Sequence, residues 1–533
     1  MITKLKNQVK HLPLIIILLI AFSLRFINLG YSDYQGDEIK AFFKKDANVS
    51  TANFLLNQRK GPGQFFVTYA IKFINPNYSN ELVSRFPFAF AGGLSVFFLY
   101  KLVELHFGKK VAFYSSFFFA TNGFFVALSR IVQYQSFVIL FMVCALYYLS
   151  LSMETEKYKY KGLFLGLFFW ALSVLFHYDG VFIAPLGLFL IFSWVKKNVK
   201  KFNFSDNNFK KLFKYSIVSL IFVLSFYIPF VFNLSQNTLS YWSGRVTGDV
   251  SSKLSSSKYL FTVYQPIYVV HFYLVLALSG SAYLITYAFK ILLKGRKNTF
   301  MKVLNLLPFD KEFSAITFFY VLWILVPLVF LEAFVYIPGT HIYTYLLPLS
   351  VLLAFGIVYI EKIIHLFKRF IHPNVISYAG IALLFVFLYL QSYAIFVDNT
   401  EEYPWESERF LIWELHQPTP IFHLSMFGFP YYRNWEGISN VIVSSDNNGY
   451  YSTNERSSIA RHFVPLNKST NDAGHYIHIL KPQSFNNKIQ HEKAAYWSER
   501  YHPIFTFSRN GEDLVRVYYM ESGKLEEIIE KGY

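Results

Sequence analysis

Cysteine is nearly absent from this chain: Cys144 is the only one in 533 residues, and it lies within an apolar run. A single cysteine excludes an intrachain disulfide and a cysteine-based metal site. Charged residues are also scarce, at 16% of the chain, against 54% hydrophobic and 20% aromatic residues. This composition is too apolar for an ordinary soluble domain, so it predicts a polytopic membrane protein.

Acidic residues are outnumbered, 33 against 50 basic ones, which gives a formal charge of +17. A basic chain can bind nucleic acid, but these lysines and arginines stand mostly in short clusters between apolar runs, as membrane topology requires. We therefore expect no nucleic-acid partner. The first apolar stretch, residues 12–29, follows Lys4, Lys6 and Lys10, exceeds a typical signal sequence in length and lacks a convincing cleavage site. It is predicted to be a retained first span.

Apolar windows long enough for a membrane helix recur along the first 400 residues and predict about eleven spans, within two. They lie at 12–29, 84–105, 111–128, 134–152, 162–177, 180–195, 214–233, 268–292, 314–333, 342–363 and 375–397. Alternate connections carry the basic clusters, which the positive-inside rule assigns to the cytoplasm. The first long loop, 30–83, and the C-terminal tail then both face outward.

The tail differs from the rest in having charged and Asn/Ser-rich stretches between short apolar runs. These runs include Ile421–Phe427, Val441–Ser444 and Tyr476–Leu480. Residues 504–508 and 514–520 flank Asn510-Gly511, a pair that favours positive φ and hence a tight β-hairpin. The predicted fold is therefore an α-helical polytopic membrane domain over 1–398, followed by a soluble C-terminal α/β or α+β domain over 399–533.

Two adjacent carboxylates, Asp37 and Glu38, follow the first span on the outward side. A carboxylate there can take the proton of an acceptor as it attacks an activated sugar. The alternative is a solvated acidic pair that caps an interfacial helix through its N-terminus. The residues alone leave both interpretations open.

Two basic residues could hold an anion on the same side. Lys60 precedes the Gly61-Pro62 turn, where exposed backbone nitrogens and an ammonium group make a plausible phosphate site. A lysine near lipid can also be a simple head-group anchor. Arg130 lies at the outward junction of two spans, where it either pairs with a phosphate or carboxylate or reaches out to water.

Further polar groups stand at outward span ends. They are Gln133 and Gln135, His177-Tyr178-Asp179-Gly180, and the stretch 338–345 with Thr340, His341 and Tyr345. A single histidine at such a place is more often a satisfied interface residue than a ligand or base. All of these clusters nevertheless converge on one membrane face. Structural polar groups would be divided between both faces, so the convergence indicates a site.

The order of these pieces resembles the GT-C glycosyltransferase superfamily, and within it the protein O-mannosyltransferase and aminoarabinose-transferase-like group. The resemblance covers most of residues 1–365. Its matching stretches are Leu24-Arg25-Phe26 with Asp37-Glu38, Lys60-Gly61-Pro62, Ser84-Arg85-Phe86-Pro87, Ser129-Arg130, and Thr340-His341 through Leu347-Pro348.

The resemblance implies a function for each candidate residue. Asp37 would be the catalytic base, Glu38 its neighbour in the acceptor site, and Lys60 and Arg130 the contacts to a lipid phosphate. Gln135, His177, Asp179, His341 and Tyr345 would line the same cavity. The chain departs from many relatives at Gln135, where they carry an acidic residue shortly after the arginine of this motif.

We therefore predict a membrane enzyme that moves a hexosyl or pentosyl group, with inversion, from a polyprenyl-phosphate donor. The acceptor would be a protein, lipid or glycan on the extracytoplasmic face of the cell membrane, among membrane lipids. No cofactor is expected, and the residues leave a divalent metal open. A transporter or flippase of lipid-linked saccharides is the alternative, but it should show charged or broken spans at mid-membrane. A non-catalytic scaffold would leave the Asp37, Lys60 and Arg130 set without a purpose.

Overall fold

The computed structural model describes most of the 533 residues. The described ranges of the helical part are 2–248, 258–267, 270–292, 315–366 and 372–400. Those of the tail are 402–403, 405–406, 408–410, 413–415, 428–445, 449–482, 501–521 and 523–531.

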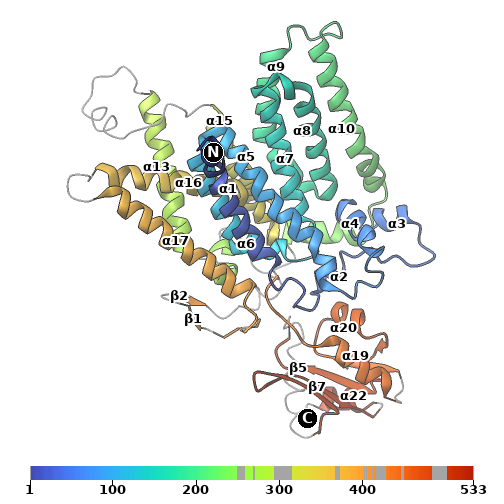
Figure 1. Ribbon diagram of the computed structural model, residues 1–533. Helices are drawn as coiled ribbons and strands as arrows, with labels where there is room; N and C mark the ends of the chain where they lie inside the picture. The colour runs from blue at the N-terminus through green and yellow to red at the C-terminus, as the bar shows by residue number, and fades with distance from the viewer. Residues whose placement is uncertain are drawn as a thin grey trace.

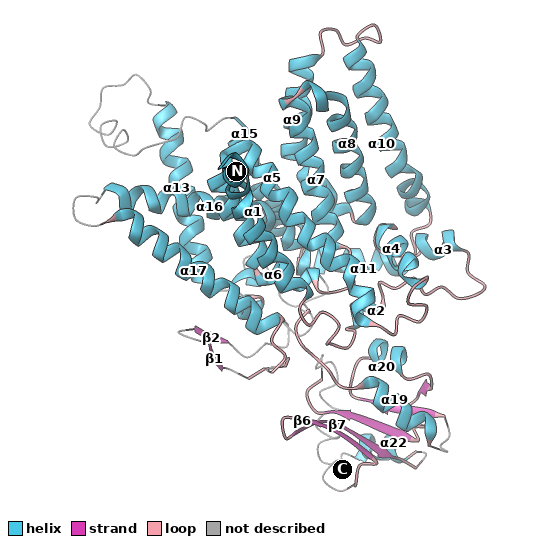
Figure 2. Ribbon diagram, viewed as in Figure 1, coloured by secondary structure: helices cyan, strands magenta, loops and turns pink. Residues whose placement is uncertain are grey.

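Long apolar helices make up the larger part of the described structure (Figures 1 and 2). Their bounds are α1 Ile2–Phe26, α5 Glu81–Thr121, α6 Gly123–Ser129, α7 Gln135–Glu154, α8 Lys159–Phe176, α9 Ala184–Asn198, α10 Asn207–Phe232, α13 Val270–Leu292, α15 Ala315–Phe334, α16 Tyr343–Leu366 and α17 Pro373–Phe396. Within the described residues, nine helical segments are long and apolar enough to cross a membrane. The chain is thus a multi-pass membrane protein.

Each of the eleven predicted windows coincides with a described helix, although the number that crosses a membrane stays a prediction. Two windows fall on the single segment Glu81–Thr121, which has non-helical backbone at Gly108. The window 111–128 is wrong at its end, because α5 stops at Thr121. The Asn122 side chain accepts a hydrogen bond from the backbone N–H of Phe124 at 3.0 Å and so caps the N-terminus of α6.

The helices bury one face and expose another, as a bundle in lipid should. In α10, only 11% of the most apolar window is buried, and Ile221, Phe222 and Val231 are exposed. In contrast, 67% of the corresponding window in α7 is buried between α5 and α8. Exposed leucine, isoleucine and phenylalanine are stable against hydrocarbon, so α10 faces lipid and α7 belongs to the core.

Short helices form the loop between α1 and α5. They are α2 Gly36–Ile39, α3 Thr51–Leu56 and α4 Gly63–Lys72. Figure 1 shows them at the end of the bundle that also carries the tail, whereas the lysine-containing connection between α9 and α10 lies at the opposite end. The predicted common side of loop and tail is confirmed. Our assignment of that side to the cell exterior stays a prediction, as does the domain boundary at residue 398.

Other short helical segments connect the spans or precede them. The 3₁₀ segments are η1 Glu156–Tyr158, η2 Tyr178–Ile183, η5 Gln265–Ile267 and η6 Gly339–Ile342. The remaining ones are α11 Gln236–Ser243 and two π-helical turns, η3 Gly244–Gly248 and η4 Tyr259–Val263. η2 and η6 matter for the site, because His177 caps η2 and His341 lies within η6.

The tail contains a mixed five-stranded sheet with helices, in agreement with the predicted α/β or α+β domain. Its order is β4-β3-β5-β7-β6, with β3 parallel to β4 and β5, and β7 antiparallel to β5 and β6. The elements are β3 Tyr450–Thr453, β4 Asn467–Lys468, β5 His475–Ile479, β6 Phe505–Arg509, β7 Glu512–Tyr519, α19 Trp435–Ser444, α20 Ser457–Phe463 and α22 Lys524–Lys531. Two short strands, β1 Glu408–Phe410 and β2 Trp413–Leu415, pair separately.

Sequence patterns predicted the hairpin of this tail, and the structure gives the place of one of the short apolar runs. The hairpin β6–β7 turns at Asn510 and Gly511, which both have positive φ, as expected. The short apolar run Val441–Ser444 is the end of the amphipathic helix α19, because Trp435, Ile438 and Ile442 complete its buried face. The run Ile421–Phe427 lies outside the described residues.

The tail is attached to the loop that carries Asp37. The backbone N–H of Arg433 donates to the Asp33 carboxylate at 2.6 Å, and Lys44 Nζ lies 2.6 Å from His462 Nδ1. Helix α20 packs against α2, so closely that a Cβ on Gly36 would lie 2.8 Å from Ser458 Oγ. The tail therefore fixes one side of the loop, and the membrane helices fix the other.

Candidate functional site

Helix α2 presents Asp37 and buries Glu38. The Gln35 side chain accepts from the Asp37 backbone N–H at 2.9 Å, and Glu38 Oε2 accepts from the Gln35 N–H at 3.0 Å, which is a reciprocal capping box. Asp37 keeps 43% of its side chain exposed, with Lys40 Nζ at 3.4 Å. Glu38 is 1% exposed. The two adjacent carboxylates therefore face different surroundings.

The Glu38 carboxylate is fully engaged inside the chain. Arg85 donates from Nε to Oε1 and from Nη2 to Oε2, both at 2.8 Å, and the Val132 N–H donates to Oε1 at 3.0 Å. With the Gln35 N–H this makes four hydrogen bonds, which leave little capacity to take a substrate proton. Glu38 thus caps helix α2, which is the alternative that the sequence analysis gave for this acidic pair. A part in the acceptor site stays a prediction, and Asp37 is the accessible carboxylate of the pair.

Lys60 is brought next to Asp37 by a bridging amide. Its Nζ donates to Gln133 Oε1 at 2.9 Å, while Gln133 Nε2 donates to the Asp37 backbone carbonyl. Nζ also lies 4.9 Å from the centroid of the Tyr134 ring. The turn that holds Lys60 needs glycine, because a Cβ on Gly61 would lie 2.0 Å from the carbonyl oxygen of Leu175 at the end of α8.

Lys60 is part-buried, and this affects its pKa. Loss of water around the ammonium group lowers the pKa of Lys60 to about 8, and the negative charge of Asp37 opposes this. Among the described residues, Lys60 makes no ion pair of its own. A dehydrated cation without a paired carboxylate is costly, and an incoming anion would remove that cost.

Arg130 has its hydrogen bonds elsewhere. Its Nη1 donates to the carbonyls of Leu24 and Ile27 at 3.0 and 2.9 Å, and its Nη2 donates to that of Asn28 at 3.1 Å. The first of these carbonyls belongs to the last turn of α1 and the other two follow it directly, so Arg130 caps the C-terminal end of the helix. The phosphate contact implied by the resemblance stays a prediction. Nε is buried and lacks a hydrogen-bond partner.

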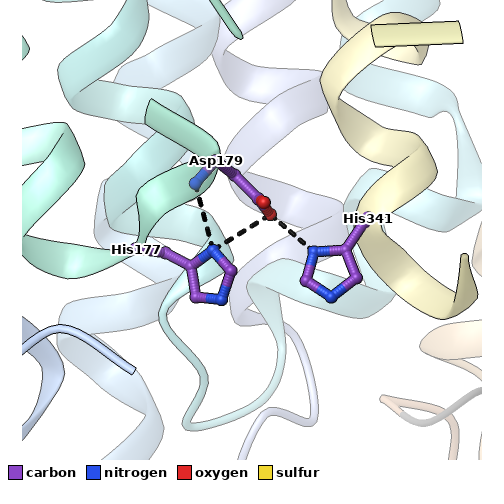
Figure 3. Close-up of side chains that lie close together, drawn as sticks. All are labelled: His177, Asp179 and His341. Carbon is purple, nitrogen blue, oxygen red and sulfur yellow. Dashed lines mark hydrogen bonds and ion pairs between the residues drawn. The ribbon is translucent and has the colours of Figure 1, made fainter. Parts of the chain in front are cut away.

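A second group of side chains meets at Asp179, as Figure 3 shows. Asp179 Oδ2 lies 2.7 Å from His341 Nδ1 and 3.2 Å from His177 Nδ1, and it accepts from the Tyr343 hydroxyl at 2.8 Å. Asp179 lies in η2, and His177 is the N-cap residue of η2. η6 supplies His341. Among the described residues, His177, Asp179 and His341 are the group whose donor atoms could share a metal ion.

Tyr134 joins this group to Lys60. Its ring stacks on that of His177 with centroids 4.1 Å apart and an angle of 8° between the planes. The same ring has Lys60 Nζ 4.9 Å from its centroid. The predicted residues Asp37, Lys60, His177, Asp179 and His341 therefore belong to one continuous set of contacts.

Two other predicted cavity residues are less closely tied to the set. Gln135 Nε2 donates to Thr340 Oγ1 at 3.3 Å, next to His341, while its Oε1 is buried without a partner. Tyr345 is 3% exposed, and its hydroxyl is also buried without a partner. Their place in a common cavity stays a prediction.

Three residues of the set were assigned no role from the sequence: Gln133, Tyr134 and Tyr343. Gln133 and Tyr134 belong to the polar stretch after Arg130, but nothing in the sequence distinguishes the amide at 133 from that at 135. Tyr343 is one of several tyrosines in 336–345. Only the geometry shows that its hydroxyl meets Asp179.

Comparisons with known proteins agree with this architecture. Residues 62–205 match the family model of dolichyl-phosphate-mannose-protein mannosyltransferases, a range that includes Arg130, Gln133 and Asp179 but not Asp37. No curated protein matches the chain.

Among solved structures, the oligosaccharyltransferase of Archaeoglobus fulgidus in its apo form superimposes with a TM-score of 0.51 at 12% identity, over 95% of this chain and 74% of that one. ArnT from Cupriavidus metallidurans gives a TM-score of 0.45 at 10% identity, over 96% and 98%. The S. cerevisiae protein O-mannosyltransferase complex gives 0.30 at 17% identity, over 45% and 35%.

These findings bear out the predicted resemblance and the glycosyltransferase interpretation that follows from it. The match to the archaeal oligosaccharyltransferase extends over nearly the whole chain, so it concerns the overall arrangement of helices and tail. The mannosyltransferase match concerns a shorter range, which includes Gln133, Tyr134, His177 and Asp179 of the site. The chain has the fold of the GT-C glycosyltransferases, and its residues 62–205 match the dolichyl-phosphate-mannose-protein mannosyltransferase family.

Proposed function

We propose that this chain transfers one hexose or pentose from a polyprenyl-phosphate carrier to an acceptor that reaches the half-exposed Asp37 carboxylate from the outward side. The observation that carries the proposal is that a half-exposed carboxylate and a part-buried ammonium group, which has no ion pair among the described residues, belong to one set of contacts. Asp37 and Lys60 are joined through Gln133, whose two ends contact the Asp37 carbonyl and Lys60 Nζ. Glycosyl transfer from a phosphate needs both charges in one site.

The chemistry assigns a part to each group. As the acceptor hydroxyl attacks the anomeric carbon, its proton passes to the Asp37 carboxylate and a new carbon–oxygen bond forms. The bond from the same carbon to the phosphate oxygen breaks, and the electron pair leaves with the polyprenyl phosphate. Lys60 neutralises the charge that develops on this leaving group. Attack opposite to the leaving group inverts the anomeric centre.

The comparisons support a lipid-linked donor. The archaeal oligosaccharyltransferase with this fold has been solved with a dolichol phosphate, and also with a tethered acceptor peptide. ArnT has been solved with undecaprenyl phosphate. A protein is therefore one acceptor to test first, with lipids and glycans as the others.

The proposal includes the orientation of the protein in the cell membrane. The loop 30–83 and the tail 399–533 would face the cell exterior, because the lysine-containing connection between α9 and α10 lies at the opposite end of the bundle. Reporter fusions at Asn57 and Gly449 test this directly. Both should report the extracytoplasmic side, and a cytoplasmic signal from either would contradict the orientation.

The activity is tested with purified full-length protein in lipid nanodiscs and a panel of radiolabelled polyprenyl-phosphate sugars. Transfer of label to a protein, lipid or glycan fraction is the expected result. Lys60→Ala should raise the donor KM by on the order of 10- to 100-fold, because a hydrogen bond to a charged group contributes about 1.5–3 kcal/mol. Lys72→Ala is the matched control, since Lys72 is an exposed lysine on the following helix α4.

Two outcomes would contradict the proposal. One is donor movement across the bilayer without transfer of the sugar, which would favour the flippase alternative. The other is a donor KM that is the same in Lys60→Ala and in Lys72→Ala.

A further inference from the structure

The Asp179 carboxylate has no role in the glycosyl transfer proposed above, in which Asp37 and Lys60 act. Asp179 is 2% exposed, and its contacts to charged or ionisable groups are His177, His341 and the phenol of Tyr343. Among the described residues, no lysine or arginine pairs with it. A buried carboxylate needs a compensating positive charge. Within the part of the chain that the structure describes, that charge can come from a proton on an imidazole or from a bound cation.

The donor atoms already face one another. His177 Nδ1 and His341 Nδ1 both lie beside Asp179 Oδ2, at 3.2 and 2.7 Å, and the three atoms are all within 4.8 Å of one another (Figure 3). Two ligand atoms on one zinc ion, each bonded at about 2.0–2.2 Å, stand roughly 3.3 Å apart. To share one ion, the two rings would approach each other and the 2.7 Å contact between His341 and Asp179 would lengthen. His177 Nδ1 would exchange the hydrogen bond that it accepts from the Asp179 backbone N–H, at 3.2 Å, for the metal.

Neighbouring groups hold these side chains in place. Tyr134 stacks on His177, and the Tyr343 hydroxyl donates to Asp179 Oδ2 at 2.8 Å. Donors to a ligating carboxylate and packing on a ligating imidazole are the usual second layer of a metal site. The three residues come from two separate segments, so the fold and not local sequence brings them together.

The chemistry of the donors selects the ion. Two imidazole nitrogens and one carboxylate oxygen suit zinc and similar divalent transition metals, whereas magnesium and calcium prefer all-oxygen sites. We propose that His177, Asp179 and His341 form a binding site for one divalent transition-metal ion, best fitted by zinc. Three protein ligands leave an open coordination position for water or another oxygen ligand.

The test measures metal binding and not activity. Full-length protein without a polyhistidine tag is purified in nanodiscs, stripped with a chelator, and titrated with zinc by calorimetry and with cobalt by visible absorption. We expect one equivalent of each, and a cobalt spectrum typical of nitrogen and oxygen ligands without thiolate charge transfer. Elemental analysis of the unstripped protein provides a second, independent stoichiometry.

Variants assign the site to its residues. His341→Ala should abolish the stoichiometric binding, because it removes a ligand that is 19% exposed and leaves Tyr343 to hold Asp179. Tyr343→Phe should weaken binding about 10- to 100-fold, as loss of an outer partner typically does. His365→Ala is the matched control: His365 is exposed and lies near the far end of α16, away from η6.

Each outcome decides the proposal. Absence of saturable cobalt binding in the wild-type protein overturns it and leaves a protonated histidine as the partner of Asp179. Equal binding by His341→Ala and His365→Ala overturns it as well. If His341→Ala is not recovered folded, the wild-type titration and the Tyr343→Phe variant still decide. Loss of sugar transfer in an Asp37 variant that binds zinc normally would separate this site from the proposed reaction.

Discussion

Two groups of charged side chains at the same end of the bundle differ in burial and in their hydrogen-bond partners. Glu38, Arg85 and Arg130 are buried, and their hydrogen bonds go to one another or to backbone groups of the chain. Asp37 remains half-exposed, and Lys60 is dehydrated without an ion pair among the described residues. The first group holds the loop to the helices. The second keeps charges that a substrate can use, which is the difference the predictions below address.

The largest effect is expected at Asp37. Asp37→Asn keeps the shape of the side chain but removes the basic oxygen, and loss of a general base typically lowers the rate on the order of 10² to 10⁴. The measurement is turnover with a saturating polyprenyl-phosphate donor in nanodiscs, with donor binding checked separately. The stability of the variant should be unchanged, since the N-cap bond of α2 goes to the Asp37 backbone and not to its side chain.

Near-native turnover in Asp37→Asn would end its assignment as the base. Asp179 would then be the next carboxylate to consider, because it belongs to the same set of contacts.

Glu38 should behave in the opposite manner. Glu38→Gln leaves the buried Arg85 guanidinium without its carboxylate, and breaking a buried ion pair costs about 3 to 5 kcal/mol of unfolding free energy. Unfolding in mixed micelles at increasing SDS measures this. The double change Glu38→Gln with Arg85→Met should recover part of the loss, because no uncompensated charge remains. A stable Glu38→Gln protein with reduced turnover would instead support a direct part in the acceptor site.

The sequence predicted much of this arrangement, and the reasons for its successes are local. A membrane helix is set by its own apolar residues, and the β6–β7 turn by the two residues that tolerate positive φ. Asp37 and Lys60 could be chosen as candidates because charges at a membrane boundary are few and conspicuous, and their roles stay predictions. Each of these signals can be read within a short window of the chain.

The partners of buried charges could not be predicted in this way. Arg130 meets the end of α1, about a hundred residues earlier in the chain, and Asp179 meets His341, 162 residues later. Such contacts depend on which segments the bundle brings together. For the same reason, the sequence could suggest Arg130 as a phosphate contact but could not show that three backbone carbonyls accept its hydrogen bonds.

Arg130 offers a direct test of that distinction. Arg130→Met keeps an unbranched apolar stem but removes three hydrogen bonds to the end of α1, at about 1.5–3 kcal/mol for a charged hydrogen bond. We expect a lower unfolding free energy in SDS titration and a donor KM close to that of the wild type. A tenfold rise in donor KM at unchanged stability would support the phosphate contact that the resemblance implies.

The smallest effect concerns the alkaline limb of the pH profile, which Lys60 should set. Burial lowers its pKa to about 8 from the ordinary 10.5, so the ammonium group is charged below pH 8 and loses its proton above it. Donor phosphate then loses its cation, and kcat/KM for the donor should fall several-fold between pH 8 and 9.

Unfolding cannot produce that fall through Lys60. Between pH 8 and 10.5 the unfolded chain binds more protons at this residue than the folded one, so its contribution to stability rises with pH. Lys60→Arg separates the two causes, because a guanidinium stays charged at every pH of the assay. Its kcat/KM should be lower overall, since its fork fits the ammonium site imperfectly, but flat from pH 7 to 9.5. The same alkaline fall in Lys60→Arg as in the wild type would show that another group titrates. Lys60 would then have a structural role, like Glu38 and Arg130, and no contact with the donor.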